Sequence, residues 1–271
     1  MKAAVVQMNS TRDGAANMAA AERLVRRAAD AGADLVVLPE KWPWLAAGEG
    51  VVEGAQRLDG PAFTAASAWA SELGIHLVAG SLTEQRPDGA LSNTSVAFGP
   101  DGRPLATYRK IHMFDVDVGG ISYRESDYET AGAETVSFEA GPVGVGLAIC
   151  YDLRFPELFR DLADRGVEVV AVPAAFTETT GRDHWEVLVR ARAIENQCFV
   201  LAANQFGEAE PEYGFWGHSM IVDPWGERLA TVDEGEGFAV SDLDLARLED
   251  IRSDLPALRH RRSELFGRVE A

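Results

Sequence analysis

Residues 143–157 read VGVGLAICYDLRFPE, an apolar run that stops at Cys150 and gives way to polar residues. The run over 143–149 predicts a strand buried on both faces, because its apolar residues do not alternate with polar ones. Pro156 then predicts the start of a helix near 155–165, since proline is favoured in the first helical turn. A strand that turns sharply into a helix exposes the side chain at the turn and leaves backbone N–H groups free beside it.

The same alternation of strand and helix extends outward from this stretch. Residues 2–7 and 35–38 predict buried strands, and apolar residues recur at helical spacing between them, over 15–31. The other elements expected in the first half are a helix over 61–73 and strands over 75–80, 92–98 and 105–108, with a turn at 99–102.

The second half repeats this plan. Laying residues 75–107 over 199–231 pairs identical residues, among them Pro87 with Pro211, Pro100 with Pro224, Gly102 with Gly226, and Leu105-Ala106-Thr107 with Leu229-Ala230-Thr231. Chance could produce some matches in an alanine-rich chain, but the elements also follow in the same order, so we interpret the pattern as an internal duplication.

A duplicated unit of this kind predicts an α/β fold, a four-layer α-β-β-α sandwich with the helices outside. No Gly/Ser/Pro linker separates the halves. We therefore expect a single domain over 1–271, with pseudo-repeat halves of about 1–110 and 143–232 and a C-terminal tail over 243–271.

Charge restricts the partners of the chain. The 271 residues include 43 acidic and 25 basic ones, a formal net charge of −18. Such a surface disfavours nucleic acid and anionic membranes, which both need a basic patch. Only three basic residues are lysines, Lys2, Lys41 and Lys110. A high-salt host and a GC-rich genome would both produce this composition.

Two cysteines, Cys150 and Cys198, cannot form a disulfide framework. Met1-Lys2 is followed directly by the strand-like run over 3–6, so we expect no signal peptide. The longest apolar runs are too short to span a membrane. These features predict a soluble, cytoplasmic protein.

Three polar residues are expected at strand ends, where α/β folds place their sites. Glu40 follows 35–38 directly and is suited to act as a general base, although an ordinary acid at a strand exit would look the same. Cys150, near a helix N-terminus that favours the thiolate, is a candidate nucleophile, whereas Cys198 reads as a buried structural cysteine. Lys110 ends the strand over 105–108 and could stabilise an oxyanion.

Taken together, Pro39-Glu40, Tyr108-Arg109-Lys110 and residues 149–157 resemble the Glu–Lys–Cys motifs of the nitrilase superfamily of carbon–nitrogen hydrolases. The resemblance extends to Asp223-Pro224-Trp225-Gly226. It implies the duplicated sandwich and a hydrolase that cleaves a non-peptide C–N bond through a cysteine thioester, with ammonia released and with no metal or organic cofactor.

The resemblance also implies residue roles. Cys150 would attack the amide or nitrile carbon, Glu40 would be the general base, and Lys110 and the Tyr151 N–H would hold the oxyanion. Glu125 matches the position of an assisting second glutamate, and its neighbour Glu129 is the less favoured candidate.

Within the superfamily, residues 150–157, 181–188, 190–197 and 217–219 look most like ω-amidases and deaminated glutathione amidases, which act on small carboxylate-bearing amides. Arg154 could bind such a carboxylate or form an ion pair with Glu157. Phe176 and Thr177, with Trp42 and Trp44, are candidate pocket walls. Residues 115–123 depart from these relatives, since Gly119-Gly120 stands where Pro-Gly is more usual.

Other hypotheses remain open at this point. A nitrilase, an N-carbamoyl-amino-acid hydrolase or an N-acyltransferase would share the motifs, as would a non-catalytic nitrilase-fold module that binds a partner protein. A papain-like hydrolase would need a histidine, such as His184 or His218, beside Cys150. The partners we expect are a small-molecule amide substrate and a second copy of the chain, because similar proteins dimerise through helices like that over 188–193.

Overall fold

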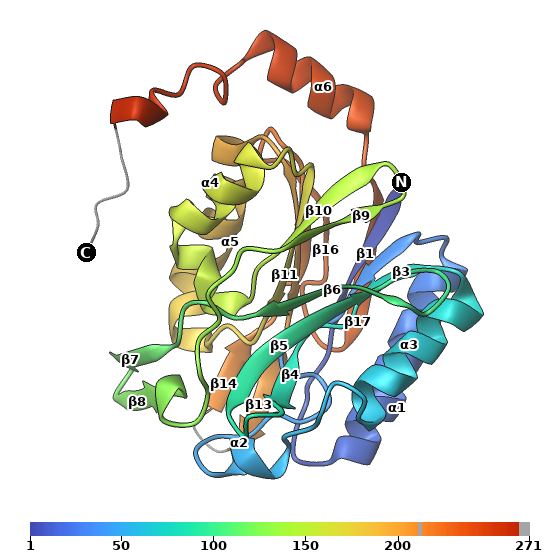
Figure 1. Cartoon of the computed structure of the whole chain (residues 1–271), viewed down its shortest axis with the longest axis vertical. Helices are drawn as coiled ribbons and strands as arrows, with labels where there is room; N and C mark the ends of the chain where they lie inside the picture. The colour runs from blue at the N-terminus through green and yellow to red at the C-terminus, as the bar shows by residue number, and fades with distance from the viewer. Residues whose placement is uncertain (211–212, 266–271) are drawn as a thin grey trace.

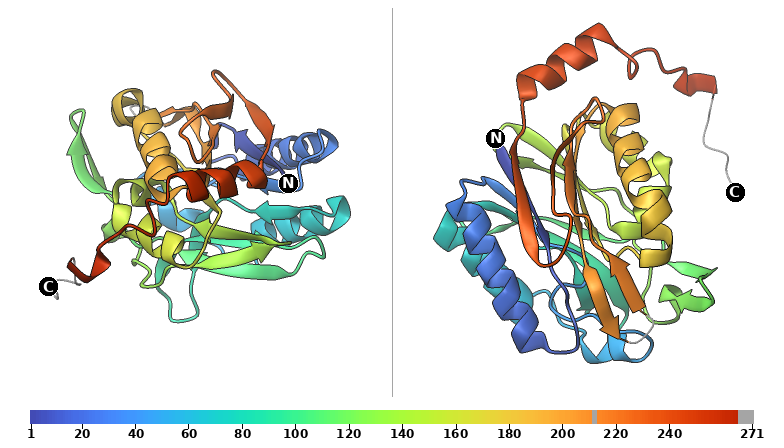
Figure 2. Two further views of the ribbon diagram at one scale, coloured as in Figure 1. Left: turned by 90° about the horizontal axis from the view of Figure 1, so that it is seen from above. Right: turned by 180° about the vertical axis from the view of Figure 1, so that it is seen from behind.

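A computed structural model describes residues 1–210 and 213–265 of the chain. Two sheets pack face to face, and helices cover the outer face of each (Figures 1 and 2). The strands explain the layers, because successive side chains point to opposite faces. In the first strand, Ala3 and Val5 enter the core between the sheets, whereas Ala4 and Val6 pack under the helices. The predicted four-layer α-β-β-α sandwich is thereby confirmed.

The first sheet has the strand order β17-β1-β2-β3-β5-β4, with β6 paired to β5. Its strands β1, β2 and β3 run parallel, and the others pair antiparallel. Its members are β1 (Lys2–Gln7), β2 (Leu35–Val37), β3 (His76–Val78), β4 (Leu82–Gln85), β5 (Leu91–Phe98), β6 (Pro104–Arg109) and β17 (Gly237–Asp242).

The second sheet has the order β16-β15-β12-β11-β10-β9. Its members are β9 (Ser137–Ala140), β10 (Val143–Leu147), β11 (Val169–Ala174), β12 (Phe199–Asn204), β15 (Met220–Val222) and β16 (Arg228–Thr231). Strands β10, β11 and β12 are parallel, and β15 and β16 continue the sheet antiparallel. The first sheet has the same arrangement, with parallel β1, β2 and β3 continued by antiparallel β5 and β6. This repeated order matches the duplication inferred from the sequence, although Pro211 lies outside the described residues.

Four long helices form the outer layers. They are α1 (Gly14–Asp30) and α3 (Pro61–Leu73) on the first sheet, and α4 (Pro156–Asp164) and α5 (Glu178–Asn196) on the second. Local signals set their ends: the Asp13 side chain accepts the Ala16 N–H at 3.0 Å, and Gly74 closes α3 in the left-handed region at φ 65°. Short α2 (Gly50–Glu53) lies in the loop between β2 and α3.

Two hairpins that the sequence did not predict stand at one end of the sandwich (Figure 1). One is β7 (Asp115–Val118) with β8 (Ile121–Arg124), and the other is β13 (Phe206–Glu210) with β14 (Tyr213–Trp216). Gly119 and Gly120 form the turn of the first hairpin with φ values of 62° and 81°. Both positions require left-handed backbone, which explains why this loop has two glycines and no proline.

The C-terminal segment lies at the opposite end. It contains α6 (Leu245–Asp254) and a short 3-10 turn η3 (Ser263–Leu265), and Arg261 in the arginine-rich stretch pairs with Asp164 of α4. Residues 266–271 of the predicted tail lie outside the described residues. None of the helices in the described part of the chain is long and apolar enough to cross a membrane.

Candidate active site

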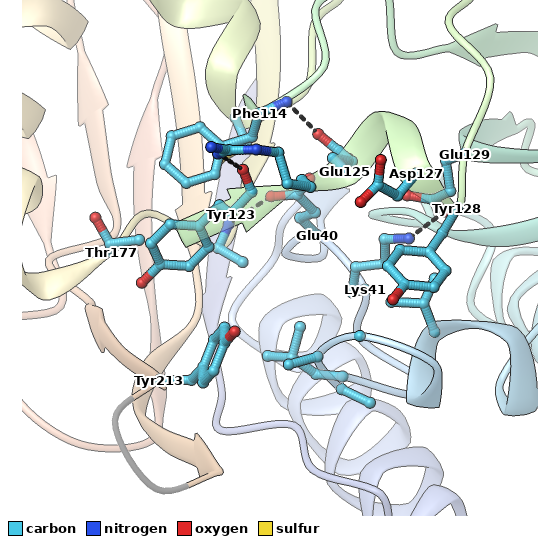
Figure 3. A pocket seen from close by; sticks show the side chains of 18 of the residues that line it. Glu40, Lys41, Phe114, Tyr123, Glu125, Asp127, Tyr128, Glu129, Thr177 and Tyr213 are labelled. Carbon is cyan, nitrogen blue, oxygen red and sulfur yellow. Dashed lines mark hydrogen bonds and ion pairs between the residues drawn. The ribbon is translucent and has the colours of Figure 1, made fainter. Parts of the chain in front are cut away.

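Three polar side chains singled out in the sequence meet where strands of both sheets end. Glu40 follows β2, Lys110 follows β6 and Cys150 follows β10. All three line one cavity of about 370 Å³, and only 4%, 2% and 7% of their surfaces are exposed. Figure 3 shows Glu40 in this cavity together with the acidic and tyrosine side chains around it.

The Glu40 carboxylate is the centre of the contacts. Its Oε1 accepts from Asn93 Nδ2 at 2.7 Å and from Lys110 Nζ at 3.0 Å, and its Oε2 accepts from the Ala175 backbone N–H at 2.8 Å. The Cys150 thiol lies near this carboxylate, whose negative charge helps to raise the pKa of the thiol. One carboxylate therefore joins residues of both sheets, since Lys110 follows a strand of the first sheet and Ala175 a strand of the second.

Lys110 Nζ lies between two carboxylates. Glu125, in the 3-10 turn η1 (Glu125–Asp127), accepts from it at 2.9 Å and 2.8 Å, opposite the Glu40 contact. Burial would lower the pKa of Lys110, yet the Glu125 and Glu40 anions raise it well above its ordinary value. The ammonium group is therefore a buried positive charge on the wall of the cavity.

Glu125 is held from three sides. Besides Lys110, its carboxylate accepts from Asn93 Nδ2 at 3.1 Å and from the Phe114 backbone N–H at 2.7 Å. Burial would raise the pKa of Glu125, but the ammonium groups of Lys110 and Lys41 outweigh it and lower that pKa. This carboxylate is consequently an ionised partner that orients Lys110.

Cys150 differs from the sequence-based expectation in its ionisation. Burial raises the pKa of its thiol well above the ordinary value, and the Glu40 anion adds to this effect against the opposing charge of Lys110. The predicted preference for a thiolate at a helix N-terminus is therefore wrong, because desolvation outweighs the five-residue 3-10 helix η2 (Cys150–Arg154). The direction of this shift favours the neutral thiol over the thiolate.

The turn that carries Cys150 is braced by Asp152. Its carboxylate accepts from the Ile149 N–H at 2.9 Å, the Tyr108 hydroxyl at 2.6 Å and the His112 N–H at 3.1 Å. These contacts hold Cys150 at φ 45°, a left-handed conformation that is unusual for cysteine. Tyr151 lies beside Cys150 in a small extension of the cavity, with Phe176 and Thr177.

The structure does not bring every predicted residue to the cavity. Thr177 lines the main cavity, and Phe176 lines only its small extension. Arg154 lines neither; its guanidinium lies 5.0 Å from the Phe176 ring and 3.2 Å from His184 Nδ1. The two tryptophans proposed as walls also do not line it: Trp42 is buried against Trp69 in the helix-side core, and Trp44 Nε1 donates to Gly50 O at 2.9 Å.

No histidine is among the described residues that line the cavity. His184 contacts Arg154, and the His218 ring stacks on Trp216 with its Nδ1 2.7 Å from the Trp216 carbonyl. A papain-like Cys–His pair is therefore not formed by either of the two histidines considered.

Sequence reasoning missed Asn93, which donates to both glutamates. The residue lies in β5 within Ser92-Asn93-Thr94-Ser95, four polar residues that are all fully buried. A polar run inside a strand next to Lys110 was an available signal, because buried polar side chains need partners. Three tyrosines that line the cavity, Tyr123, Tyr128 and Tyr213, were also missed, because their positions depend on the two hairpins and on the end of η1.

The chain is similar to known proteins over nearly its whole length. A family model described as carbon-nitrogen hydrolase matches residues 2–253. Omega-amidase NIT2 of Homo sapiens is 40% identical over 265 residues, which cover 97% of this chain and 96% of that protein. Deaminated glutathione amidase of Rattus norvegicus is 41% identical, covering 97% and 83%. The crystal structure of Saccharomyces cerevisiae Nit3, a member of branch 10 of the nitrilase superfamily, matches with a TM-score of 0.88 and 31% identity, covering 97% and 96%.

Proposed function

The chain belongs to the carbon–nitrogen hydrolase family and is an amidase, and on that premise we propose that Cys150, Glu40 and Lys110 carry out the reaction. The observation that supports this assignment is the single Glu40 carboxylate, which accepts from Lys110 Nζ at 3.0 Å and shares the cavity wall with the Cys150 thiol, whose pKa it helps to raise. A thiol with a raised pKa needs a base at contact distance to become a nucleophile, and Glu40 is that base.

In the first half of the proposed reaction, Glu40 takes the thiol proton as Cys150 Sγ bonds to the amide carbon. The carbonyl oxygen becomes an oxyanion, which Lys110 Nζ and the Tyr151 N–H stabilise. The C–N bond then breaks, Glu40 returns its proton to the leaving nitrogen, and ammonia departs from a thioester.

In the second half, Glu40 takes a proton from a water molecule whose oxygen attacks the thioester carbon. The C–S bond breaks, the sulfur regains a proton, and the product is a carboxylic acid. Glu125 is proposed as an assisting residue, because its contacts with Lys110 and Asn93 keep the ammonium group in place.

We propose a small linear, carboxylate-bearing amide as substrate, in agreement with the names of the relatives from Homo sapiens and Rattus norvegicus. A cavity of about 370 Å³ suits a molecule of this size. Arg154 lies outside the lining, and the basic residues among the described ones that line the cavity are Lys41, Lys110 and Arg124.

A substrate panel tests the proposal. Ammonia release is measured with α-ketoglutaramate, deaminated glutathione, glutamine, a simple nitrile and N-carbamoyl-β-alanine. We expect turnover of the carboxylate-bearing amides. Turnover of the nitrile alone would identify a nitrilase, and carbon dioxide released together with ammonia would identify a carbamoyl hydrolase. No turnover by wild type and by Cys150→Ala alike would favour a non-catalytic module.

A homodimer and a cytoplasmic location complete the proposal. Exposed Val187 and Ile194 on α5 support an interface on that helix, with 66% and 48% of their surfaces open to solvent. Light scattering that gave a strict monomer would contradict it. The two free, buried cysteines suit a reducing compartment, which fractionation of the host cell can check.

A further inference from the structure

A second buried ion pair lies on the cavity wall, and the reaction described above does not use it. Lys41 Nζ pairs with the Glu129 carboxylate, and their side chains are only 11% and 2% exposed. Lys41 Nζ also donates to Thr83 Oγ1 in β4 at 2.6 Å. Both charged residues line the cavity (Figure 3). Burying two charges is costly, so a pair at this position calls for an explanation.

The pair joins the two segments that carry the catalytic carboxylates. Lys41 directly follows Glu40, and its own backbone N–H donates to Ser81 Oγ at 3.1 Å. Glu129 follows Glu125 by one helical turn, and its N–H donates to the Glu125 carbonyl at 2.9 Å. The Lys41–Glu129 contact therefore spans from the loop after β2 to the turn η1, beside the Glu40–Lys110–Glu125 contacts.

The backbone at Lys41 adds a second observation. This residue has φ 55°, a left-handed conformation that is unfavourable for lysine. Such a conformation persists when the surroundings hold it, and here Thr83 and Glu129 hold the end of the side chain. The turn that aims Glu40 into the cavity thus depends on contacts made by its neighbour.

The charges act on Glu125 as well. The charged groups that face Glu125 are Lys110, Glu40, Lys41 and Glu129. Lys41 helps to lower the pKa of Glu125. Burial and the Glu125 carboxylate raise the pKa of Glu129 in spite of Lys41, which shows that the two acids repel each other. Removal of either member of the pair therefore changes the ionisation of Glu125, and in opposite directions.

We propose that Lys41 and Glu129 are positioning residues that keep Glu40 and Glu125 at a fixed spacing on the two sides of Lys110 Nζ. This proposal rests on the proposed function, since it assigns the pair to the same reaction. Neither residue touches the reacting atoms; both act through the carboxylates beside them.

The test compares Lys41→Met and Glu129→Gln, which remove one charge each with little change in shape. We expect kcat to fall on the order of ten- to a hundredfold in both, because small displacements of catalytic groups cost about this much. The acid limb of the kcat–pH profile moves to higher pH in Lys41→Met, where Glu125 loses a cation. It moves to lower pH in Glu129→Gln, where Glu125 loses an anion and keeps the cation.

Two further variants separate positioning from folding. The double variant Lys41→Met/Glu129→Leu replaces the buried pair by apolar side chains, which should keep the melting temperature near that of wild type while kcat stays low. The control is Asp223→Asn. Asp223 is another buried carboxylate, on the turn between β15 and β16, and it pairs with Arg247 at 3.1 Å. The substitution removes this ion pair. It should lower the melting temperature and leave kcat and the acid limb unchanged.

Wild-type kcat and an unmoved acid limb in both single variants would overturn the proposal, as would a double variant with full activity.

A second readout keeps this result distinct from failure of the proposed function. In a Cys198→Ser background, iodoacetamide alkylates Cys150, whose sulfur displaces iodide, and intact mass measures the rate without turnover. If wild type hydrolyses no amide but both variants still alkylate several-fold more slowly, the function fails and the positioning stands. If amides are hydrolysed and the variants alkylate and turn over like wild type, the positioning fails.

Discussion

The two halves of the sandwich share a strand order but carry different residues at the strand ends. In the first half, β2 leads to Glu40 and β6 to Lys110; in the second, the matching positions after β11 and β16 are Ala175 and Glu234. Conversely β10 leads to Cys150, whereas its counterpart β1 leads to Met8, which is buried among apolar residues. Each half therefore supplies what the other lacks, and the site exists only where the two sheets meet.

The largest expected effect separates the two cysteines of the second half. Cys150→Ala should abolish ammonia release, a loss on the order of 10⁴-fold or more, because no nucleophile remains. Cys198→Ala should leave kcat unchanged, since burial raises the pKa of Cys198 to about 12 and the thiol lies outside the cavity. Ammonia assays on both purified variants decide this, and residual turnover in Cys150→Ala would remove the nucleophile assignment.

The next effect tests the contribution of the first half. Glu40→Gln and Lys110→Met should each lower kcat by roughly 10²- to 10⁴-fold, the range expected for a general base or an oxyanion donor. Both variants should still fold, as judged by circular dichroism. Turnover close to wild type in Glu40→Gln would show that another group takes the Cys150 proton.

A moderate effect is expected at the brace between the halves. Asp152 of the second half accepts the Tyr108 hydroxyl of the first at 2.6 Å and also holds the Ile149 N–H. Asp152→Asn should leave one buried donor unpaired, which costs about 1–3 kcal/mol of stability. It should also lower kcat about tenfold by loosening the turn at Cys150. Urea unfolding and kcat are the measurements, and an unchanged unfolding midpoint would contradict the brace.

The smallest effect concerns two glutamates at matching positions of the repeat. Glu84 is buried and accepts from Arg109 at 2.7 Å and 2.8 Å, whereas Glu208 is exposed. Burial would raise the pKa of Glu84, but the hydrogen bonds from Arg109 and Thr94 outweigh it and lower that pKa. Its contribution to stability is therefore complete above the unfolded-state pKa and is lost as the pH falls through the folded-state pKa.

Glu84→Gln should accordingly lower the melting temperature at neutral pH by a few degrees and flatten the loss of stability in acid. Glu208→Gln should behave like wild type across the same range. Thermal melts from pH 3 to pH 7 test both variants. The same dependence of melting temperature on pH in the two would show that Glu84 and Glu208 contribute equally to stability.

Features that depend on local sequence were predictable, whereas features that depend on contacts between segments far apart in the chain were not. Apolar runs ended by a polar residue placed Glu40 and Cys150, because a buried strand must leave the core where its apolar residues stop. The Cys150 thiol was predicted to ionise because only its own helix was visible, and burial by the other sheet reverses that. Arg154 was proposed from its position four residues after Cys150, which does not fix the direction of a long side chain.

The contacts of Lys41 show the same limit. Its proximity to Glu129 depends on how the segment after η1 packs against the loop after β2, and nothing in either segment specifies that approach. Asn93 is an intermediate case, since its buried polar run was visible in the sequence but its two partners were not.

The place of β17 in the first sheet has a consequence for synthesis of the chain. β1 pairs with β2 on one side and with β17 on the other, and the Leu243 N–H donates to the Met1 carbonyl at 2.8 Å. The ribosome makes β1 well before β17, so the outer edge of β1 stays uncovered until β17 is made. Until then that edge offers unpaired N–H and C=O groups to other nascent chains. A premature stop before Gly237 would leave it open permanently, so truncated products should aggregate even though they contain every proposed catalytic residue.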